Sequence, residues 1–226
     1  MNKRLNFKRL WLISERDQTA RKQEFSKSKT LLLGKNGTGK SRITKHLFWV
    51  FGCDPIKRAA GTWDPDIIAG LDFSLDDLDY FVLRKGKRLA LFDSQFKLLL
   101  AADEMRSWDN LFAQFIGYKL QLQRHSGSAF AQAGPTYLTL PFYMDQDGSW
   151  GADWDTYSNL TQFKDWKKPT FEAFIGMRPN AYFEAKLNEN EAKQAANEFR
   201  NELNAQKNAF KRVHNFLPKN VPSLCV

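Results

Sequence analysis

The chain has 226 residues, of which 42% are hydrophobic and 14% aromatic, so it can bury a core in one domain or in one domain with an appendage. Its two cysteines are too few for a disulfide framework or a zinc site. No apolar run reaches the roughly 18 residues of a membrane span, and no segment of signal-peptide length follows the basic N-terminus. We therefore expect a folded cytoplasmic protein without a membrane partner.

Positive charge is concentrated at the start of the chain. The net charge is +9, from 34 Lys and Arg against 25 Asp and Glu, and residues 1–45 alone hold 13 basic and three acidic residues, a net +10. The rest of the chain therefore sums to −1. Such a field attracts a nucleotide alone or a DNA backbone as well, and the charge by itself does not distinguish the two.

The first elements in chain order are three predicted strands. Residues 5–13 alternate apolar and polar side chains, as a half-buried strand does. A polar turn at residues 14–19 leads to a second strand at residues 20–25. The apolar run Leu31–Leu33 predicts a third, buried strand.

A phosphate-binding loop is predicted directly after this run. The segment Gly34-Lys35-Asn36-Gly37-Thr38-Gly39-Lys40-Ser41 fits the pattern G-x-x-x-x-G-K-[ST]. Its glycines let consecutive N–H groups turn inward around an oxyanion, Lys40 can reach the β- and γ-phosphates of ATP, and the Ser41 hydroxyl can ligate Mg²⁺. Residues 41–51 predict an amphipathic helix whose N-terminus points at the phosphates. The alternative is an ordinary Gly-rich turn, which gives the adjacent Lys and Ser no purpose.

Short strands and one helix are predicted beyond this point. The predicted strands at residues 67–73, 80–84, 88–92 and 96–101 form a β-meander, since acidic or Gly-containing turns separate them. Residues 105–118 predict a helix. Residues 137–144 predict a strand that ends at Asp145-Gln146-Asp147, and residues 150–168 show no clear period.

A long helix is predicted over residues 179–217. Its seam positions alternate steps of three and four for about five heptads, which is the pattern of a coiled coil, and the helix reaches on the order of 50 Å. These positions are Tyr182, Ala185, Glu189, Ala192, Ala196, Phe199, Leu203, Gln206, Phe210, Val213 and Leu217. The alternative is a long amphipathic helix that packs on its own domain. Pro218 and Pro222 end the helix and leave residues 218–226 as a tail.

The predicted phosphate loop contains Asn36 and thereby resembles the G-x-N-G-x-G-K-S form found in SMC, RecF and RecN proteins. The presence of two strands before the loop resembles the layout of ABC-type ATPase heads. The segments Leu10–Glu15 and Leu140–Asp147 resemble the SMC-like ATPase subunit of Lamassu-type anti-phage defence systems. The resemblance covers nearly the whole chain. It implies an α/β fold, with an ABC-ATPase-like N-terminal lobe at residues 1–178 that combines a P-loop core and an antiparallel β-subdomain, followed by the coiled-coil helix.

In such heads a Q-loop glutamine helps to bind Mg²⁺ and the attacking water. Gln146 matches that residue in order and context, because it follows the predicted strand and precedes the long helix. The resemblance therefore implies Lys40 and Gln146 as catalytic residues, Gly34 to Ser41 as the ATP site, and Ser41 with Gln146 as the Mg²⁺ ligands.

Other interpretations of these segments remain open. Gln146 can belong to an ordinary polar turn, because Asp-Gly is a common turn pair. Asp145 and Asp147 are not expected to act as a catalytic carboxylate pair. By analogy with the equivalent turn of SMC heads, the resemblance also places Ser14 and Arg16 near the base or the phosphates.

The second half of an ABC-type head has no counterpart in this sequence. Neither a Ser-Gly-Gly signature motif nor an apolar strand ending in Asp-Glu follows the predicted coil. The resemblance therefore implies the ATP-binding half of an SMC-like, DNA-acting ATPase of DNA repair or anti-phage defence. It would hydrolyse ATP only when a C-terminal lobe, in cis or in trans, completes it.

The implied partners are that lobe, a second head in an ATP-dependent dimer, DNA, and a nuclease or other defence subunit. The alternative function is a non-catalytic nucleotide-binding scaffold that docks a partner through its coiled coil. The ATPase of an ABC transporter fits less well, because those domains have no coiled coil after the Q-loop.

Overall fold

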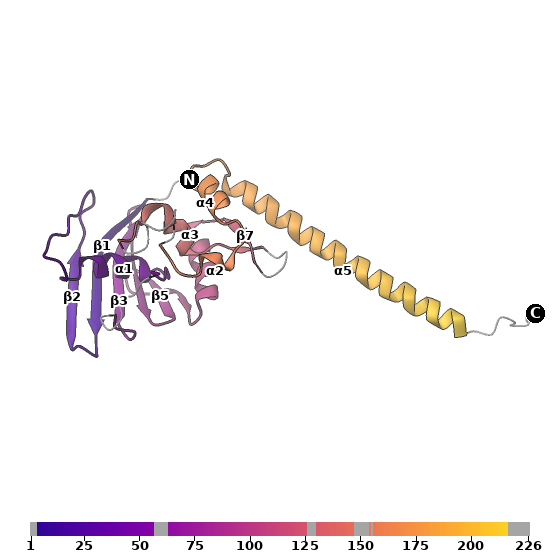
Figure 1. Ribbon diagram of the computed structural model, residues 1–226, viewed down its shortest axis with the longest axis horizontal. Coiled ribbons are helices and arrows are strands. Elements are labelled where there is room, and N and C mark those ends of the chain that lie inside the picture. Colours follow the sequence, from indigo (N-terminus) through magenta and orange to yellow (C-terminus); the bar gives the residue numbers. More distant parts are fainter. Residues whose placement is uncertain (1–3, 57–62, 126–129, 147–153, 155, 217–226) are drawn as a thin grey trace, which may run out of the picture. The chain divides into compact units, whose positions relative to one another are not determined.

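The computed structural model describes residues 4–56, 63–125, 130–146, 154 and 156–216 (Figure 1). The chain divides into two compact units, one up to Asn180 and one from Ala181. The first is a mixed α/β unit built on an antiparallel sheet, and the second holds most of one long helix. No helix within the described ranges is both long and apolar enough to cross a membrane.

Six strands form one antiparallel sheet in the order β2-β1-β3-β4-β5-β6 (Figure 1). They are β1 (Leu5–Ser14), β2 (Thr19–Glu24), β3 (Ile68–Leu75), β4 (Leu78–Lys85), β5 (Arg88–Asp93) and β6 (Leu98–Ala102). The two-residue turn between β3 and β4 places Asp76 and Asp77 at φ of 51° and 68°, the backbone that such tight turns require. The predicted first two strands and the predicted meander are confirmed, and all six strands lie in the same sheet.

An aromatic cluster joins this sheet to two helices, α1 (Lys40–Trp49) and α2 (Met105–Ile116). The ring of Phe51, just after α1, lies 5.3 Å from that of Phe73 on β3 and 5.4 Å from that of Phe112 on α2, between centroids. The indole N–H of Trp108 donates to the Phe51 carbonyl oxygen at 2.7 Å. Burial of one phenylalanine contributes roughly 1.5–3 kcal/mol, so this cluster fixes α1 against the sheet. Both helices were predicted from the sequence and are confirmed.

Shorter elements complete the first unit. They are the hairpin β7 (Gln121–Gln123) and β8 (Phe130–Gln132), α3 (Pro135–Thr139), the 3₁₀ turns η1 (Leu140–Phe142) and η2 (Leu160–Gln162), and α4 (Lys167–Phe174). Tyr137 is fully buried in this region, and its hydroxyl donates to the carbonyl oxygen of Leu160 at 2.9 Å. This bond ties α3 to η2.

Two predicted strands are wrong. The segment Leu31–Leu33 has no regular secondary structure and pairs with no described strand, and Leu31 and Leu33 are 78% and 82% exposed. An apolar strand is buried only where neighbouring strands and a covering layer exist, and no described strand pairs with this segment. Residues 137–142 belong to α3 and η1 instead of a strand, because Pro135 is the first residue of α3 and Pro141 the second residue of η1, and proline favours the first turn of a helix.

The second unit contains α5 (Asn180–Phe216), a helix of 37 residues of which Asn180 belongs to the first unit. The predicted long helix is therefore confirmed. The seam side chains Phe199, Leu203, Phe210 and Val213 are between 49% and 73% exposed. Pairing with another helix stays a prediction. The predicted seam residue Leu217, the predicted tail and Asp147 lie outside the described residues.

Candidate nucleotide-binding site

The predicted phosphate loop, residues 34–41, turns directly into the N-terminus of α1. Gly37 and Gly39 have φ of +80° and +85°, and Gly39 is the residue that caps the helix. Only glycine takes this backbone readily. A Cβ added to Gly34 would lie 2.7 Å from the Thr38 hydroxyl oxygen. The backbone geometry of the loop therefore depends on Gly37 and Gly39, whereas Gly34 leaves room for the Thr38 side chain.

The Lys40 side chain folds back over this loop. Its Nζ donates hydrogen bonds to the carbonyl oxygens of Gly34 at 2.7 Å and Lys35 at 2.9 Å. An anionic phosphate is a stronger acceptor for an ammonium group than a neutral carbonyl is. A phosphate group bound in the loop would therefore compete for this ammonium group.

Ser41 and Gln146 meet although 105 residues separate them in sequence. The Ser41 hydroxyl donates to Gln146 Oε1 at 2.6 Å. Both side chains offer neutral oxygen ligands, and Mg²⁺ binds such oxygens together with phosphates and water. The structure thus brings together the two predicted Mg²⁺ ligands, while their metal role stays a prediction. Among the described residues no group of three or more His, Cys, Asp and Glu could hold a metal.

A buried ion pair positions the residue before Gln146. Lys45 of α1 lies 3.5 Å from Asp145, and their side chains are 4% and 1% exposed. The Tyr143 hydroxyl donates to the other Asp145 oxygen at 3.0 Å. These contacts tie the predicted Q-loop to the helix that follows the phosphate loop. The expectation that Asp145 and Asp147 form no catalytic carboxylate pair stays a prediction, because Asp147 lies outside the described residues.

A cavity of about 790 Å³ lies beside the phosphate loop, within the size range of small-molecule sites. Its walls are the loop, the start of α1, Gln146 and the turn between β1 and β2. From this turn and its flanking strands come Leu12, Ser14, Asp17, Thr19, Ala20 and Arg21. Arg16 instead forms an ion pair with Asp17 at 2.9 Å. Asp17, Thr19 and Arg21 were not predicted, because a polar turn carries no signal of which side chains face a ligand.

Asp64 is hydrogen-bonded to this turn through Ser14. It is buried, and it accepts hydrogen bonds from the Ser14 hydroxyl at 2.5 Å and from the Asp66 backbone N–H at 3.0 Å. The bond from Ser14 is the main cause that lowers the pKa of Asp64. The Ser14 oxygen in turn accepts the backbone N–H of Asp17 at 3.0 Å. A chain of bonds therefore holds the turn that faces the phosphate loop.

Comparison with known proteins finds a distant relative. No protein-family model matches the chain. The chain is similar to the Lamassu protein LmuB of Bacillus sp. (strain NIO-1130), with 22% identity over 152 residues. The match covers 66% of this chain and 26% of that protein, so the chain spans about a quarter of its relative's length. This similarity supports a distant relationship to a Lamassu protein.

Proposed function

We propose that this chain is the ATP-binding half of an SMC-like, DNA-acting ATPase of anti-phage defence or DNA repair. The observation that carries the proposal is the 2.6 Å hydrogen bond between Ser41 and Gln146. It joins the phosphate loop to a glutamine from a distant part of the chain, and an ordinary Gly-rich turn has no need of such a contact. The distant similarity to a Lamassu protein supports the defence context.

ATP would occupy the cavity beside the loop. The N–H groups of residues 34–41 and the positive end of α1 would hold its phosphates, and Lys40 would place its charge at the β- and γ-phosphates. Ser41 and Gln146 would hold Mg²⁺, which neutralises phosphate charge when bound. Gln146 would also orient the attacking water, and electrostatic stabilisation of the transferring phosphoryl group is the expected chemistry.

We do not expect this chain to hydrolyse ATP by itself. Leu31 and Leu33 lead into the phosphate loop, Met144 leads into Gln146, and all three are largely exposed. Exposed apolar side chains in the segments that lead into a binding site favour a surface that a partner covers. The C-terminal lobe, in cis or in trans, would cover them and supply the remaining catalytic groups.

The basic start of the chain supports DNA as a further partner. On the exposed side of β1 and β2, the Trp11 ring has the Arg9 guanidinium 5.9 Å and the Lys22 ammonium 5.6 Å from its centre. Each cation also contacts a carboxylate. Cationic side chains contact phosphates and an aromatic ring can stack on a base. Binding of DNA at this surface would weaken as the salt concentration rises.

The test is ATP binding and turnover by the purified chain, beside Lys40→Ala. Calorimetric titration with ATP and MgCl₂ is expected to show binding by the unmutated chain, and at least tenfold weaker binding after loss of the Lys40 charge. Lys87→Ala, at an exposed turn position, is the control and is expected to bind normally. Phosphate release is expected to be absent for all three proteins.

Two results contradict the proposal in different ways. Failure of the unmutated chain to bind Mg-ATP contradicts the nucleotide site. Turnover that disappears in Lys40→Ala places the catalytic base within these residues and contradicts the requirement for a second lobe.

A non-catalytic scaffold is the second candidate, because the apolar seam of α5 is exposed and suits a partner helix. In that case the chain would bind nucleotide and dock a partner without turnover. A Lys40→Ala variant that retains full biological activity would favour this candidate.

A further inference from the structure

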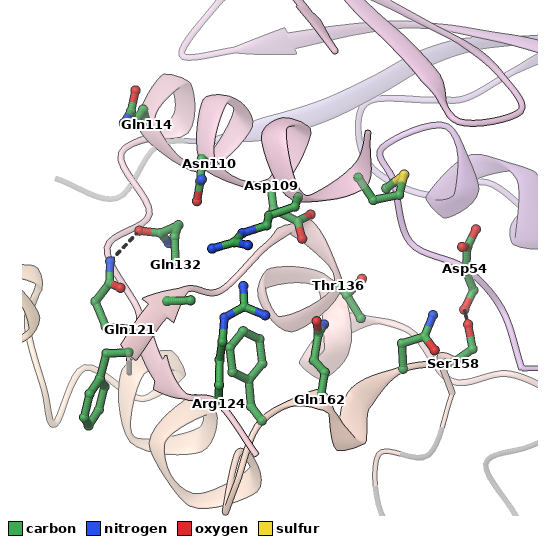
Figure 2. Close-up of a pocket in the computed structure, with 17 residues that line it drawn as sticks. Asp54, Asp109, Asn110, Gln114, Gln121, Arg124, Gln132, Thr136, Ser158 and Gln162 are labelled. Carbon is green, nitrogen blue, oxygen red and sulfur yellow. Dashed lines mark hydrogen bonds between the residues drawn. The ribbon is translucent and has the colours of Figure 1, made fainter. Parts of the chain in front are cut away.

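A second cavity, of about 660 Å³, is formed by residues of α2, the hairpin β7–β8, α3 and the segment 158–163 (Figure 2). Gly52 and Asp54, which follow the C-terminal end of α1, also line it. The phosphate loop leads into the other end of that helix, and no described residue lines both cavities. Its volume lies in the range of small-molecule sites. It is therefore a candidate site separate from the nucleotide cavity.

Many of the side chains in the wall of this cavity are carboxamides. There are six of them, Asn110, Gln114, Gln121, Gln132, Asn159 and Gln162. The two N–H donors of the Gln132 Nε2 group share three backbone carbonyl oxygens at 3.0–3.1 Å. Gln121 donates to the Gln132 side-chain oxygen at 2.9 Å (Figure 2). Each carboxamide offers both donors and an acceptor. The wall is thus suited to a polar ligand and is partly fixed before any ligand binds.

Asp109 of α2 supplies an unmatched negative charge. Its carboxylate lies close to Gly134, since a Cβ atom added to Gly134 would be 2.1 Å from Oδ1 of Asp109. It forms no hydrogen bond or ion pair with a described residue, whereas the neighbouring Asp54 is paired with Arg84 at 3.0 Å. Burial, and secondly Asp54, raise the pKa of Asp109 to about 7 against the opposing effects of Arg124 and Arg84. A donor on a ligand would relieve the cost of this partly buried carboxylate.

Arg124, at the end of β7, supplies the opposite charge. Its guanidinium lies 5.7 Å from the ring centre of Phe163 and forms no ion pair with a carboxylate of the described chain. Figure 2 shows the Arg124 and Asp109 side chains projecting into the same space. The two charges therefore face one cavity without neutralising each other directly.

A ligand that carries both charges satisfies both side chains. We propose that this cavity binds a small amphoteric molecule of the amino-acid or short-peptide class, with its ammonium or guanidinium group on Asp109 and its carboxylate on Arg124. Guanidinium and carboxylate groups form strong, often bidentate hydrogen bonds, and the carboxamides bind the remaining polar groups. Few apolar side chains line the cavity, so the ligand's own side chain is polar.

Ligands with charge of one sign fit less well. A purely anionic ligand, such as phosphate, places a second negative charge beside Asp109, and a purely cationic ligand meets Arg124 and Arg106. The charged groups that act on Asp109 are Asp54, Arg84 and Arg124. Since only the ionised carboxylate attracts a cation, affinity for an amphoteric ligand rises as the pH increases through about 7. Affinity for an anion falls over the same range.

The experiment is a calorimetric titration of the purified chain with L-arginine, L-glutamine and the dipeptide Gly-Gln, at about pH 6 and about pH 8. Agmatine, which lacks the carboxylate, and inorganic phosphate, which lacks a cation, are the comparison probes. A short peptide with a free terminal carboxylate and its amidated form distinguish the end of a polypeptide from a free metabolite. The variants are Asp109→Asn and Arg124→Gln, with Asp103→Asn, at an 86% exposed position outside the cavity, as the matched control.

The proposal expects at least one amphoteric probe to bind, and to bind more tightly at the higher pH. Loss of either charge is expected to weaken that binding at least tenfold, with no change in Asp103→Asn. If agmatine, phosphate or the amidated peptide binds as tightly as the best amphoteric probe, the proposal is overturned. The same holds if no probe binds, or if binding survives in both cavity variants. Should Asp109→Asn fail to fold, Arg124→Gln and the pH comparison still decide the outcome.

Discussion

Removal of one partner of the buried ion pair between Lys45 and Asp145 tests how the predicted Q-loop is held. The pair joins α1 to the residue before Gln146 at 3.5 Å, and almost no solvent reaches either side chain. In Asp145→Asn the Lys45 ammonium keeps its buried position but loses the carboxylate, and in Lys45→Met the carboxylate loses its cation. Breaking such a pair lowers the free energy of unfolding by about 3–5 kcal/mol. With a urea m-value of about 2 kcal/mol/M, the urea concentration at the midpoint of unfolding falls by roughly 2 M.

The assay is urea unfolding followed by tryptophan fluorescence, since the chain has seven tryptophans. The double variant Lys45→Met/Asp145→Asn is expected to recover most of the lost stability, because it leaves no uncompensated buried charge. Asp79→Asn breaks a comparable ion pair, with Lys8, whose side chains are 35% and 51% exposed. Asp79→Asn is the matched control, and it is expected to lower the free energy of unfolding by less than about 1 kcal/mol.

The same variants connect stability with the nucleotide site. If the ion pair positions Gln146, each single variant also weakens binding of ATP in the presence of Mg²⁺, and the double variant partly restores it. If each single variant lowers the free energy of unfolding by less than about 1 kcal/mol, the structural role of the pair is refuted. Clearly destabilised single variants with normal Mg-ATP affinity would instead refute its role in positioning Gln146.

Arg84→Met is expected to lower the free energy of unfolding by about 3–5 kcal/mol, because it removes a buried guanidinium that is hydrogen-bonded to a carboxylate and to two backbone carbonyls; thermal unfolding measures the loss. Burial raises the pKa of the Cys53 thiol to about 12, so in a Cys225→Ser background a thiol reagent at about pH 8 should label the chain only after unfolding. Labelling of the folded chain would contradict this burial. The hydrogen bond from Ser14 lowers the pKa of Asp64 below its ordinary value of 3.8. At pH values above 3.8 the ionised carboxylate therefore stabilises the folded chain, and this stabilisation is lost as the pH falls through the lowered pKa. Asp64→Asn is expected to remove that part of the acid dependence in urea unfolding at a series of pH values, and an unchanged pH profile would contradict it.

Local patterns predicted the sheet and the helices because their signals lie within single segments. Alternation over residues 5–13 and the acidic turn Asp76-Asp77 were sufficient for strands that the structure contains. The strand predicted at Leu31–Leu33 is wrong because an apolar run favours a buried strand but does not indicate whether a neighbouring strand is present to pair with it. For residues 137–142, Pro135 and Pro141 decided in favour of helical turns over a weak strand pattern.

The candidate site was predictable only where a motif spans it. The glycine and lysine pattern of the phosphate loop and the position of Gln146 after the meander were visible in the sequence, and the two segments do meet. The contact of Asp64 with Ser14 and the pairing of Lys45 with Asp145 were not visible, because each joins distant segments without a recurring spacing. The cavity around Asp109 escaped prediction for the same reason.

The exposed side chains beside the phosphate loop bear on how a second lobe would join. Leu31, Leu33 and Met144 are 78%, 82% and 86% exposed, and burying each contributes about 1.5–3 kcal/mol, hence on the order of 5–9 kcal/mol in all. Association of separate molecules costs about 4–15 kcal/mol, so these contacts alone leave little net affinity. A connection through α5 and a partner helix would raise the effective concentration of the lobe to about the millimolar range. We therefore expect a C-terminal lobe that carries the partner helix to bind this chain much more tightly than the same lobe without it.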